Sequence, residues 1–220
     1  MNQKNNIKIA PSILSANFAK LGEEVALISK SADLIHIDVM DGNFVPNITI
    51  GSAVVKSLRN YSSLIFDVHL MTLDIDKHII SFAEAGADII TIHAEACTHL
   101  DRRLNLIKSL GKKAAVSLIP SSHENKLDYV MDLVDMILVM TVNPGYAGQT
   151  FIPNQLNKIK LIRDKITQSG RNIDLQVDGG INDVTAKQVI EAGANVLVSG
   201  AYIFKDGPDF YSRNISCLRK

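Results

Sequence analysis

Short apolar runs, rich in β-branched residues, recur along the whole chain, and each ends in small or polar residues. The runs cover residues 7–14, 34–40, 64–71, 89–93, 114–119, 136–142, 175–178 and 196–200. Between them the apolar positions follow the three- to four-residue spacing of an amphipathic helix, as in 18–31 and 156–167. The segment 183–192 adds helix-end signals, with Asp183 as a predicted N-cap and Gly193 just past its end. The pattern predicts eight strands in strict alternation with helices.

The strand runs are mostly continuous rather than alternating, which is typical of a parallel sheet covered by helices. Eight such units in 220 residues fit a closed (β/α)8 barrel, an α/β fold, better than an open doubly wound sheet. No Gly-x-Gly-x-x-Gly motif follows the first run, which weakens the case for a dinucleotide-binding fold. We therefore expect a single barrel domain over residues 1–220.

Charge and composition exclude several classes of partner. The chain has 23 Lys and Arg against 23 Asp and Glu, so no basic excess favours nucleic acid or an anionic membrane. No apolar run approaches the roughly 18 residues that a membrane span needs, and residues 1–6 lack the apolar region of a signal peptide. Cys97 and Cys217 are too few for a disulfide framework and are expected as reduced thiols. The predicted location is the cytoplasm.

The second run carries an unusual polar pair. Strand side chains alternate between two faces, so His36, Asp38 and Met40 share one face of an otherwise apolar strand. Burying an imidazole and a carboxylate is costly unless something satisfies them. A divalent metal would do so, and so would a hydrogen bond between the two without any metal. In a barrel of this type the active site lies at the carboxyl ends of the strands, which is where this pair stands.

Other strand ends add further ligands. His69 lies near the end of the third run and Asp178 near the end of the seventh, so these two join His36 and Asp38 around one mouth. Each of the four alone is best interpreted as a satisfied buried polar group. Together they favour one divalent metal ion, with Zn²⁺, Mn²⁺, Fe²⁺ and Co²⁺ equally compatible because availability often decides the metal. His93, at the end of the fourth run, is expected to support the site rather than bind the metal.

Glycine-bearing loops follow the last three strands. They contain Gly145, Tyr146, Ala147 and Gly148 after the sixth run, Gly179 and Gly180 after the seventh, and Gly200 and Ala201 after the eighth. Such barrels commonly bind phosphate with the loops after strands seven and eight, although the glycines could also serve only as tight turns. Three methionines, Met40, Met71 and Met140, end strands and could either wall the site or fill the core. No lysine ends a strand, which argues against a Schiff-base aldolase.

Five stretches, 11–16, 36–47, 67–71, 142–145 and 177–180, closely resemble the ribulose-phosphate 3-epimerase family in order and over essentially the whole chain. The resemblance implies a (β/α)8 barrel that interconverts D-ribulose 5-phosphate and D-xylulose 5-phosphate in the pentose phosphate pathway. It also implies a homo-oligomer, with Asp38 and Asp178 as the acid/base pair. The implied metal ligands are His36, Asp38, His69 and Asp178, and the implied substrate-binding residues are Ser12, Met40, His69, Met71, Met140, Gly145, Tyr146, Ala147, Gly148, Gly179, Gly180, Gly200 and Ala201.

Epimerisation at C3 removes a proton next to the C2 carbonyl and returns one to the opposite face. It therefore needs one acid and one base on opposite sides of a planar enediolate, a task that Asp38 and Asp178 could share. Three positions depart from the family pattern: Ala147 in the lid, Ala201 after the eighth strand and Ile119 after the fifth. The alternatives are a 3-epimerase of a hexulose 6-phosphate such as allulose 6-phosphate, a metal-dependent aldolase or lyase, and a sugar-phosphate-binding barrel without turnover.

Overall fold

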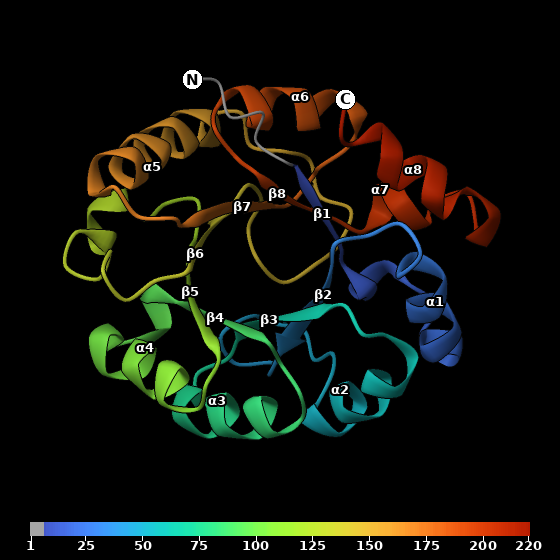
Figure 1. Ribbon diagram of the computed structural model, residues 1–220, viewed down its shortest axis with the longest axis horizontal. Helices are drawn as coiled ribbons and strands as arrows, with labels where there is room; N and C mark the ends of the chain where they lie inside the picture. The colour runs from blue at the N-terminus through green and yellow to red at the C-terminus, as the bar shows by residue number, and fades with distance from the viewer. Residues whose placement is uncertain (1–6) are drawn as a thin grey trace.

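The computed structural model describes residues 7–220 and places eight parallel strands around a barrel (Figure 1). The segment 1–6, on which the expected absence of a signal peptide rests, lies outside the described residues. The strands are β1 Lys8–Pro11, β2 Leu34–Met40, β3 Ile65–Met71, β4 Ile89–His93, β5 Lys113–Leu118, β6 Met136–Met140, β7 Asp174–Asp178 and β8 Val196–Ser199. They pair in the order β1-β8-β7-β6-β5-β4-β3-β2. A parallel bridge between Ser12, just after β1, and His36 of β2 joins the first and last strands of this order.

Helices form a ring outside the strands (Figure 1). They are α1 Leu21–Ile28, α2 Ser52–Leu58, α3 Ile75–Glu84, α4 Leu100–Ser109, α5 Gln155–Ser169, α6 Asp183–Glu191, α7 Ala201–Phe204 and α8 Tyr211–Cys217. Within residues 7–220 none of the helices combines the length and the apolar character that spanning a bilayer requires. The predicted (β/α)8 fold is confirmed.

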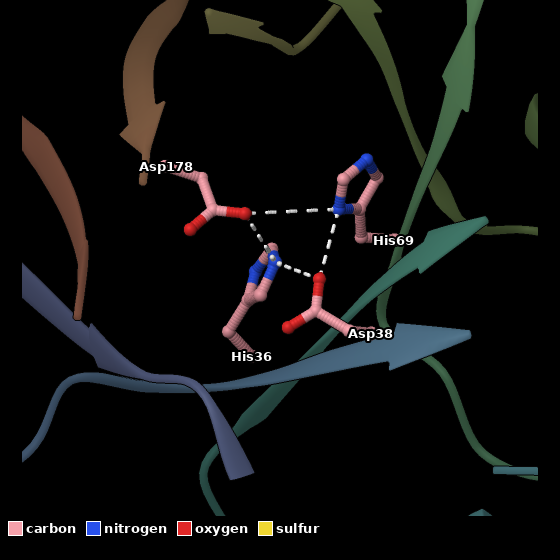
Figure 2. A group of neighbouring side chains, drawn as sticks. All are labelled: His36, Asp38, His69 and Asp178. Carbon is pink, nitrogen blue, oxygen red and sulfur yellow. Dashed lines mark hydrogen bonds and ion pairs between the residues drawn. The ribbon is translucent and has the colours of Figure 1, made fainter. Parts of the chain in front are cut away.

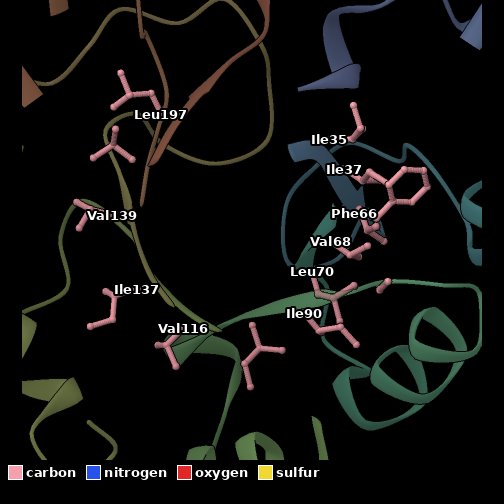
Figure 3. Close-up of a cluster of buried hydrophobic side chains, with 14 of the residues drawn as sticks. Ile35, Ile37, Phe66, Val68, Leu70, Ile90, Val116, Ile137, Val139 and Leu197 are labelled. Carbon is pink, nitrogen blue, oxygen red and sulfur yellow. The ribbon is translucent and has the colours of Figure 1, made fainter. Parts of the chain in front are cut away.

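The β2 strand shows how the sequence makes both faces of the barrel wall. All seven of its residues are buried. Ile35 and Ile37 point outward into the main core between strands and helices, together with Phe66 and Val68 of β3 (Figure 3). The alternate residues, including His36, face the barrel interior. A strand buried on both faces reads as a continuous apolar run, which is why its two polar residues stand out.

The side chains inside the barrel are apolar at the amino ends of the strands and polar toward the carboxyl ends. The layer at the amino ends is an apolar cluster that includes Leu34, Ile89 and Val196. The next layer is polar, because the Asp67 carboxylate there accepts hydrogen bonds from Gln176 Nε2 at 2.6 Å and from Thr91 Oγ1 at 3.3 Å. The polar side chains at the carboxyl ends of the strands therefore rest on a hydrogen-bonded layer rather than on an apolar plug.

The structure corrects several predicted boundaries. Strict alternation fails after β5, where the connection to β6 holds a short 3-10 helix, Glu124–Leu127, instead of an α-helix. The first strand ends at Pro11 rather than at residue 14, because the chain turns into the 3-10 helix Ile13–Ser15. The sixth strand ends at Met140, not at residue 142. These differences share a cause: local apolar spacing does not distinguish a strand end from a turn packed against the core.

The helix ends differ in similar detail. The predicted helix 18–31 divides into a 3-10 turn, Phe18–Lys20, and α1. The N-cap of α6 is Asn182 rather than Asp183, because the Asn182 side chain accepts from the backbone N–H groups of Val184 and Thr185. Thr185 Oγ1 in turn accepts from the Asn182 N–H, which completes a capping box. Gly193 does follow the helix with a φ of +114°, as a C-terminal glycine should.

Candidate active site

Four polar side chains meet at the carboxyl end of the barrel. His36 and Asp38 come from β2, His69 from β3 and Asp178 from β7, and one ligand atom of each lies within 4.8 Å of the others (Figure 2). The structure thus brings together all four residues that the sequence proposes as metal ligands. Their grouping follows from strand register, because Asp38 pairs with His69 in the β2–β3 ladder and both point into the barrel.

The contacts inside this cluster join histidine ring nitrogens to aspartate carboxylate oxygens. His69 Nδ1 lies 3.1 Å from Asp38 Oδ1 and 4.0 Å from Asp178 Oδ2. His36 Nε2 lies 3.4 Å from Asp38 Oδ1 and 3.9 Å from Asp178 Oδ2 (Figure 2). The second oxygen of Asp38 accepts a hydrogen bond from Ser12 Oγ at 2.6 Å. Two nitrogens and two carboxylate oxygens therefore converge on one point.

His36 provides the clearest test of whether a metal fits. Its Nδ1 lies 2.8 Å from Asp67 Oδ2, and since an ionised carboxylate only accepts, that nitrogen carries the proton. Its Nε2 is fully buried, faces the cluster and has no hydrogen-bond partner. An orphaned buried imidazole nitrogen beside two carboxylates is the donor set that a borderline divalent cation binds. The residues present fit such an ion.

The two carboxylates differ in their affinity for protons. Burial by itself raises the pKa of Asp38, but the neighbouring charge of His36 and the hydrogen bond with His69 hold that pKa well below its usual range. Burial and then the negative charge of Asp38 raise the pKa of Asp178 to about 7. Burial also lowers the pKa of His36, yet the charges of Asp38 and Asp67 outweigh it and raise that pKa. The cluster thus sets one carboxylate to stay ionised and the other to hold a proton near neutrality.

A third histidine, His93, lies next to the cluster, where the sequence predicts that it supports the site. Its Nε2 is 2.9 Å from His69 Nε2, and its Nδ1 is 3.2 Å from Glu95 Oε2. His69 and His93 are both fully buried, and burial lowers the pKa of His93 to about 4, so its ring is neutral. Phe44 covers His93, with ring centroids 4.7 Å apart. His93 itself contributes no atom to the metal-ligand cluster.

A cavity of about 410 Å³ opens above the four polar residues. Twelve of the thirteen predicted substrate-binding residues line it: Ser12, Met40, Met71, Met140, Gly145, Tyr146, Ala147, Gly148, Gly179, Gly180, Gly200 and Ala201. Asp38 and Asp178 form part of its wall, whereas His69 lies beneath it, with no exposed surface. A volume of this size holds a small phosphorylated sugar.

The glycines at one side of the cavity are required by backbone geometry. Gly179 and Gly180 have φ values of +118° and +67°. A Cβ on Gly180 would lie 2.6 Å from the Phe151 backbone nitrogen, and one on Gly179 would lie 2.8 Å from that of Val142. Only glycine fits at either place, so the turn after β7 presents bare backbone to the cavity.

Several neighbours of the site have no clear signal in the sequence. Thr141 Oγ1 donates to the Asp178 carbonyl oxygen at 2.9 Å and fixes the end of β7. Asn47 Nδ2 donates to the Gly145 carbonyl oxygen at 3.3 Å and links the β2 loop to the loop after β6. Asp67 stands two residues before His69, so strand periodicity puts both on the same face. That periodicity was the available sign of the contact between Asp67 and His36. Asn47 ends the stretch 36–47 that resembles the family, but nothing in the sequence marks Thr141.

A (β/α)8 barrel with paired carboxylates and histidines beneath a glycine-lined cavity defines an enzyme class, the barrel enzymes that act on small phosphorylated substrates. Residues 8–204 match the ribulose-phosphate 3 epimerase family. The chain is 52% identical over 200 residues to ribulose-phosphate 3-epimerase of Bacillus subtilis (strain 168), which covers 90% of this chain and 92% of that protein. It is 50% identical over 204 residues to the enzyme of the same name from Escherichia coli (strain K12), with 92% and 90% coverage. The chain belongs to the ribulose-phosphate 3-epimerase family.

Solved structures of more distant proteins share the fold. KGPDC from Streptococcus mutans has a TM-score of 0.70 at 18% identity, over 97% of both chains. A 3-hexulose-6-phosphate synthase has a TM-score of 0.64 at 19% identity, over 96% of both chains. At these identities the likeness concerns the barrel alone.

Proposed function

We propose that this enzyme interconverts D-ribulose 5-phosphate and D-xylulose 5-phosphate by moving the C3 proton between the carboxylates of Asp38 and Asp178. The family membership supports the pentulose phosphate over the hexulose 6-phosphate that the sequence also allowed. The observation that carries the proposal is the placement of the two carboxylates, which lie on β2 and β7 and line one cavity. The lowered pKa of Asp38 and the raised pKa of Asp178 in the metal-free protein support opposite starting states for the two groups.

Inversion at C3 requires two proton carriers in different states. The ionised Asp38 accepts the proton from one face of the sugar, and the protonated Asp178 returns one to the other face. In the reverse direction the roles exchange, because after one turnover Asp38 holds the proton and Asp178 is ionised. Ser12 Oγ, which donates to Asp38 Oδ2, fixes the orientation of that carboxylate.

A divalent cation would be held by His36 Nε2, His69 Nδ1 and one oxygen each of Asp38 and Asp178. When bound, it supplies Lewis-acid stabilisation of the negative charge that develops on the substrate oxygens. The donor set suits Zn²⁺, Fe²⁺, Mn²⁺ or Co²⁺, and zinc is one member of that group. Asp67 holds a proton on Nδ1 of His36, so the Nε2 lone pair would be available to the ion.

The remaining cavity residues bind and shield the sugar. The backbone N–H groups of Gly179, Gly180 and Gly200, with the loop 145–148, would bind the phosphate. Met40, Met71 and Met140 are nearly fully buried and line the cavity, so they exclude water without offering a competing proton. We further propose a cytoplasmic homo-oligomer that has no nucleic-acid or membrane partner, consistent with its zero net charge.

Asp178→Asn tests the acid/base assignment. The variant retains an oxygen ligand for the metal but loses the proton carrier on one face. We expect epimerisation to fall by about 10²–10⁴-fold, while C3–H exchange with D₂O persists in one epimer only, through Asp38. Both are measured by proton NMR on metal-loaded protein whose metal content is determined in parallel.

Asp174→Asn is the matched control, because Asp174 begins the same strand at the opposite end of the barrel and pairs with Lys8 at 2.8 Å. It should epimerise like the wild-type enzyme. If Asp178→Asn with a full complement of metal epimerised at the wild-type rate, Asp178 would have no part in proton transfer.

A further inference from the structure

A buried chain of side chains leads away from the candidate metal site toward the loop after β4. It begins at His69, whose Nδ1 faces Asp38 and Asp178 while its other ring nitrogen points away from them (Figure 2). That second nitrogen, Nε2, lies 2.9 Å from His93 Nε2, and His93 Nδ1 lies 3.2 Å from Glu95 Oε2. The proposed mechanism assigns no role to His93 or Glu95.

The direction of every hydrogen bond in this chain follows from its last member. An ionised carboxylate has no proton to donate, so His93 Nδ1 must donate to Glu95. A neutral imidazole has only one N–H, so His93 Nε2 carries a lone pair and accepts from His69 Nε2. His69 then has its proton on Nε2 and its lone pair on Nδ1, the nitrogen that faces the cluster.

This tautomer is not the one that the cluster alone would select. Asp38 Oδ1 lies 3.1 Å from His69 Nδ1 and would accept a proton there. If the proton moved to Nδ1, that nitrogen would lose the lone pair that ligation requires. Two carboxylates therefore compete for one proton: Asp38 on the near side, and Glu95, through His93, on the far side.

We propose that Glu95, acting through His93, holds His69 in the tautomer whose Nδ1 lone pair binds the divalent cation. Glu95 and His93 are positioning residues, and the inference rests on the metal site of the proposed function. The arrangement parallels that of His36, which binds through the opposite nitrogen and has Asp67 as its own direct carboxylate partner. Each histidine ligand thus has a carboxylate that fixes its proton.

Glu95 is held in place for this task. Its side chain is 14% exposed, and its Oε1 accepts a hydrogen bond from the backbone N–H of Ile119 at 3.3 Å. Lys158 Nζ donates to the Ile119 carbonyl oxygen at 3.0 Å and to that of Pro120 at 2.8 Å, which ties down the same loop. Ile119 departs from the usual family residue, but its hydrogen bond to Glu95 comes from the backbone N–H, which does not depend on the side chain.

The experiment compares Glu95→Ala, which removes the acceptor, with Glu95→Gln, whose amide oxygen still accepts from His93. Side-chain ¹⁵N NMR of the metal-free protein reads which nitrogen of His69 carries the proton. Competition with a fluorescent chelator gives the Kd for Zn²⁺ and for Mn²⁺. We expect wild-type His69 to be protonated at Nε2. Glu95→Ala should move the proton toward Nδ1 and weaken metal binding by roughly 10–100-fold, and Glu95→Gln should recover most of both.

Glu124→Ala is the matched control. Glu124 is a buried carboxylate in the 3-10 helix after β5, and its negative charge partly offsets the lowering of the Lys158 pKa by burial, but it makes neither a hydrogen bond nor an ion pair with His93. It should leave the His69 tautomer and the metal Kd unchanged. The inference is overturned if Glu95→Ala keeps His69 protonated at Nε2 with unaltered metal affinity, or if Glu124→Ala weakens binding equally.

The proposed function fails by a different result. Wild-type enzyme that binds no divalent cation, or that epimerises at full rate after complete chelation, contradicts the metal site itself. The tautomer measurement uses metal-free protein and no substrate. It therefore reports on the hydrogen bonds from His69 through His93 to Glu95, whatever the outcome of the activity assay.

Discussion

Asp38 and Asp178 are chemically identical side chains that the barrel places in different electrostatic surroundings. Asp38 sits between the two histidines and accepts a hydrogen bond from Ser12. Asp178 is farther from both histidines, at 3.9 and 4.0 Å, and experiences the negative charge of Asp38. The difference needed for two-face proton transfer is therefore already present in the protein before substrate binds.

The raised pKa of Asp178 has a consequence for stability. A group whose pKa is higher in the folded than in the unfolded state stabilises the fold at low pH and loses that contribution as pH rises through the folded value, here about 7. Metal-free wild-type protein should therefore lose stability relative to metal-free Asp178→Asn between about pH 4, the usual pKa of an unfolded aspartate, and about pH 7. Urea unfolding of both proteins across this range measures the difference, in which titrating groups that do not interact with Asp178 cancel.

A divalent cation should reverse that trend, since it binds the ionised carboxylate and adds stability mainly above pH 7. A free-energy difference between the two metal-free proteins that does not change with pH would mean that Asp178 titrates normally.

Among single residues, the sequence identified the four clustered side chains better than it identified the residues that contact them. His36, Asp38, His69 and Asp178 were predictable because each interrupts or ends an apolar strand, and strand ends converge in a barrel. Glu95 lies in the 3-10 helix Ala94–Ala96 that follows β4, and its contact with His93 depends on how the chain turns there. Periodicity locates a residue on a face but does not describe a loop.

Among the elements, the turn after β7 is the most constrained part of the cavity wall. Its glycines adopt positive φ values and approach the backbone of the loop after β6. The sequence predicted glycine-bearing loops at this end but not the lack of an α-helix between β5 and β6, where apolar residues such as Leu127 and Val130 pack against the core from turns. Helical spacing was present there without the continuous hydrogen bonding of a helix.

Gly179→Ala should impair substrate binding more than folding. The added Cβ would meet Val142 at a φ of +118°, so the turn must shift, and its N–H groups would move away from the proposed phosphate position. Loss of one such charge-assisted hydrogen bond costs about 1.5–3 kcal/mol, which corresponds to a rise in KM of roughly 10–100-fold. Steady-state kinetics with D-ribulose 5-phosphate measures this.

Gly207→Ala is the control for Gly179→Ala, because it introduces the backbone strain of a positive φ without a steric clash at Cβ. Gly207 also has a positive φ, +87°, but a Cβ there meets nothing within 4 Å. It should lower the stability of the fold and leave KM unchanged. Equal KM values for Gly179→Ala and the wild type would remove this turn from the phosphate site.

In the whole molecule, the end of the barrel opposite the active site shows a fourfold repeat. The residue directly before each even-numbered strand accepts a hydrogen bond from a backbone N–H of the preceding odd-numbered strand. The pairs are Asp33 with Ile9, Asp88 with Phe66, Asp135 with Ala114 and Asn195 with Leu175, at 2.7–2.8 Å. Each acceptor also meets a basic side chain, from Arg219, Arg59, Lys108 and Arg163 respectively. The repeat ties the strands together in pairs, far from the chemistry.

This repeat predicts that substitutions of Asp88 lower the stability of the fold without changing the activity. Asp88→Ala leaves the Phe66 N–H without its acceptor and removes one partner of Arg59, which still donates to backbone carbonyl oxygens such as that of Gly86. The free energy of unfolding should therefore fall by roughly 1–2 kcal/mol, a charged hydrogen bond discounted for partial exposure. Asp88→Asn should cost less, because Asn195 already performs the same task with an amide oxygen in the fourth pair. Denaturant unfolding measures the stability of both variants, with Asp164→Ala on the exposed face of α5 as control.

The kcat of every variant should equal that of the wild type, because the carboxyl ends of the strands are held by a separate set of contacts. A fall in kcat on the scale of the stability loss would show instead that the two ends of the barrel are coupled.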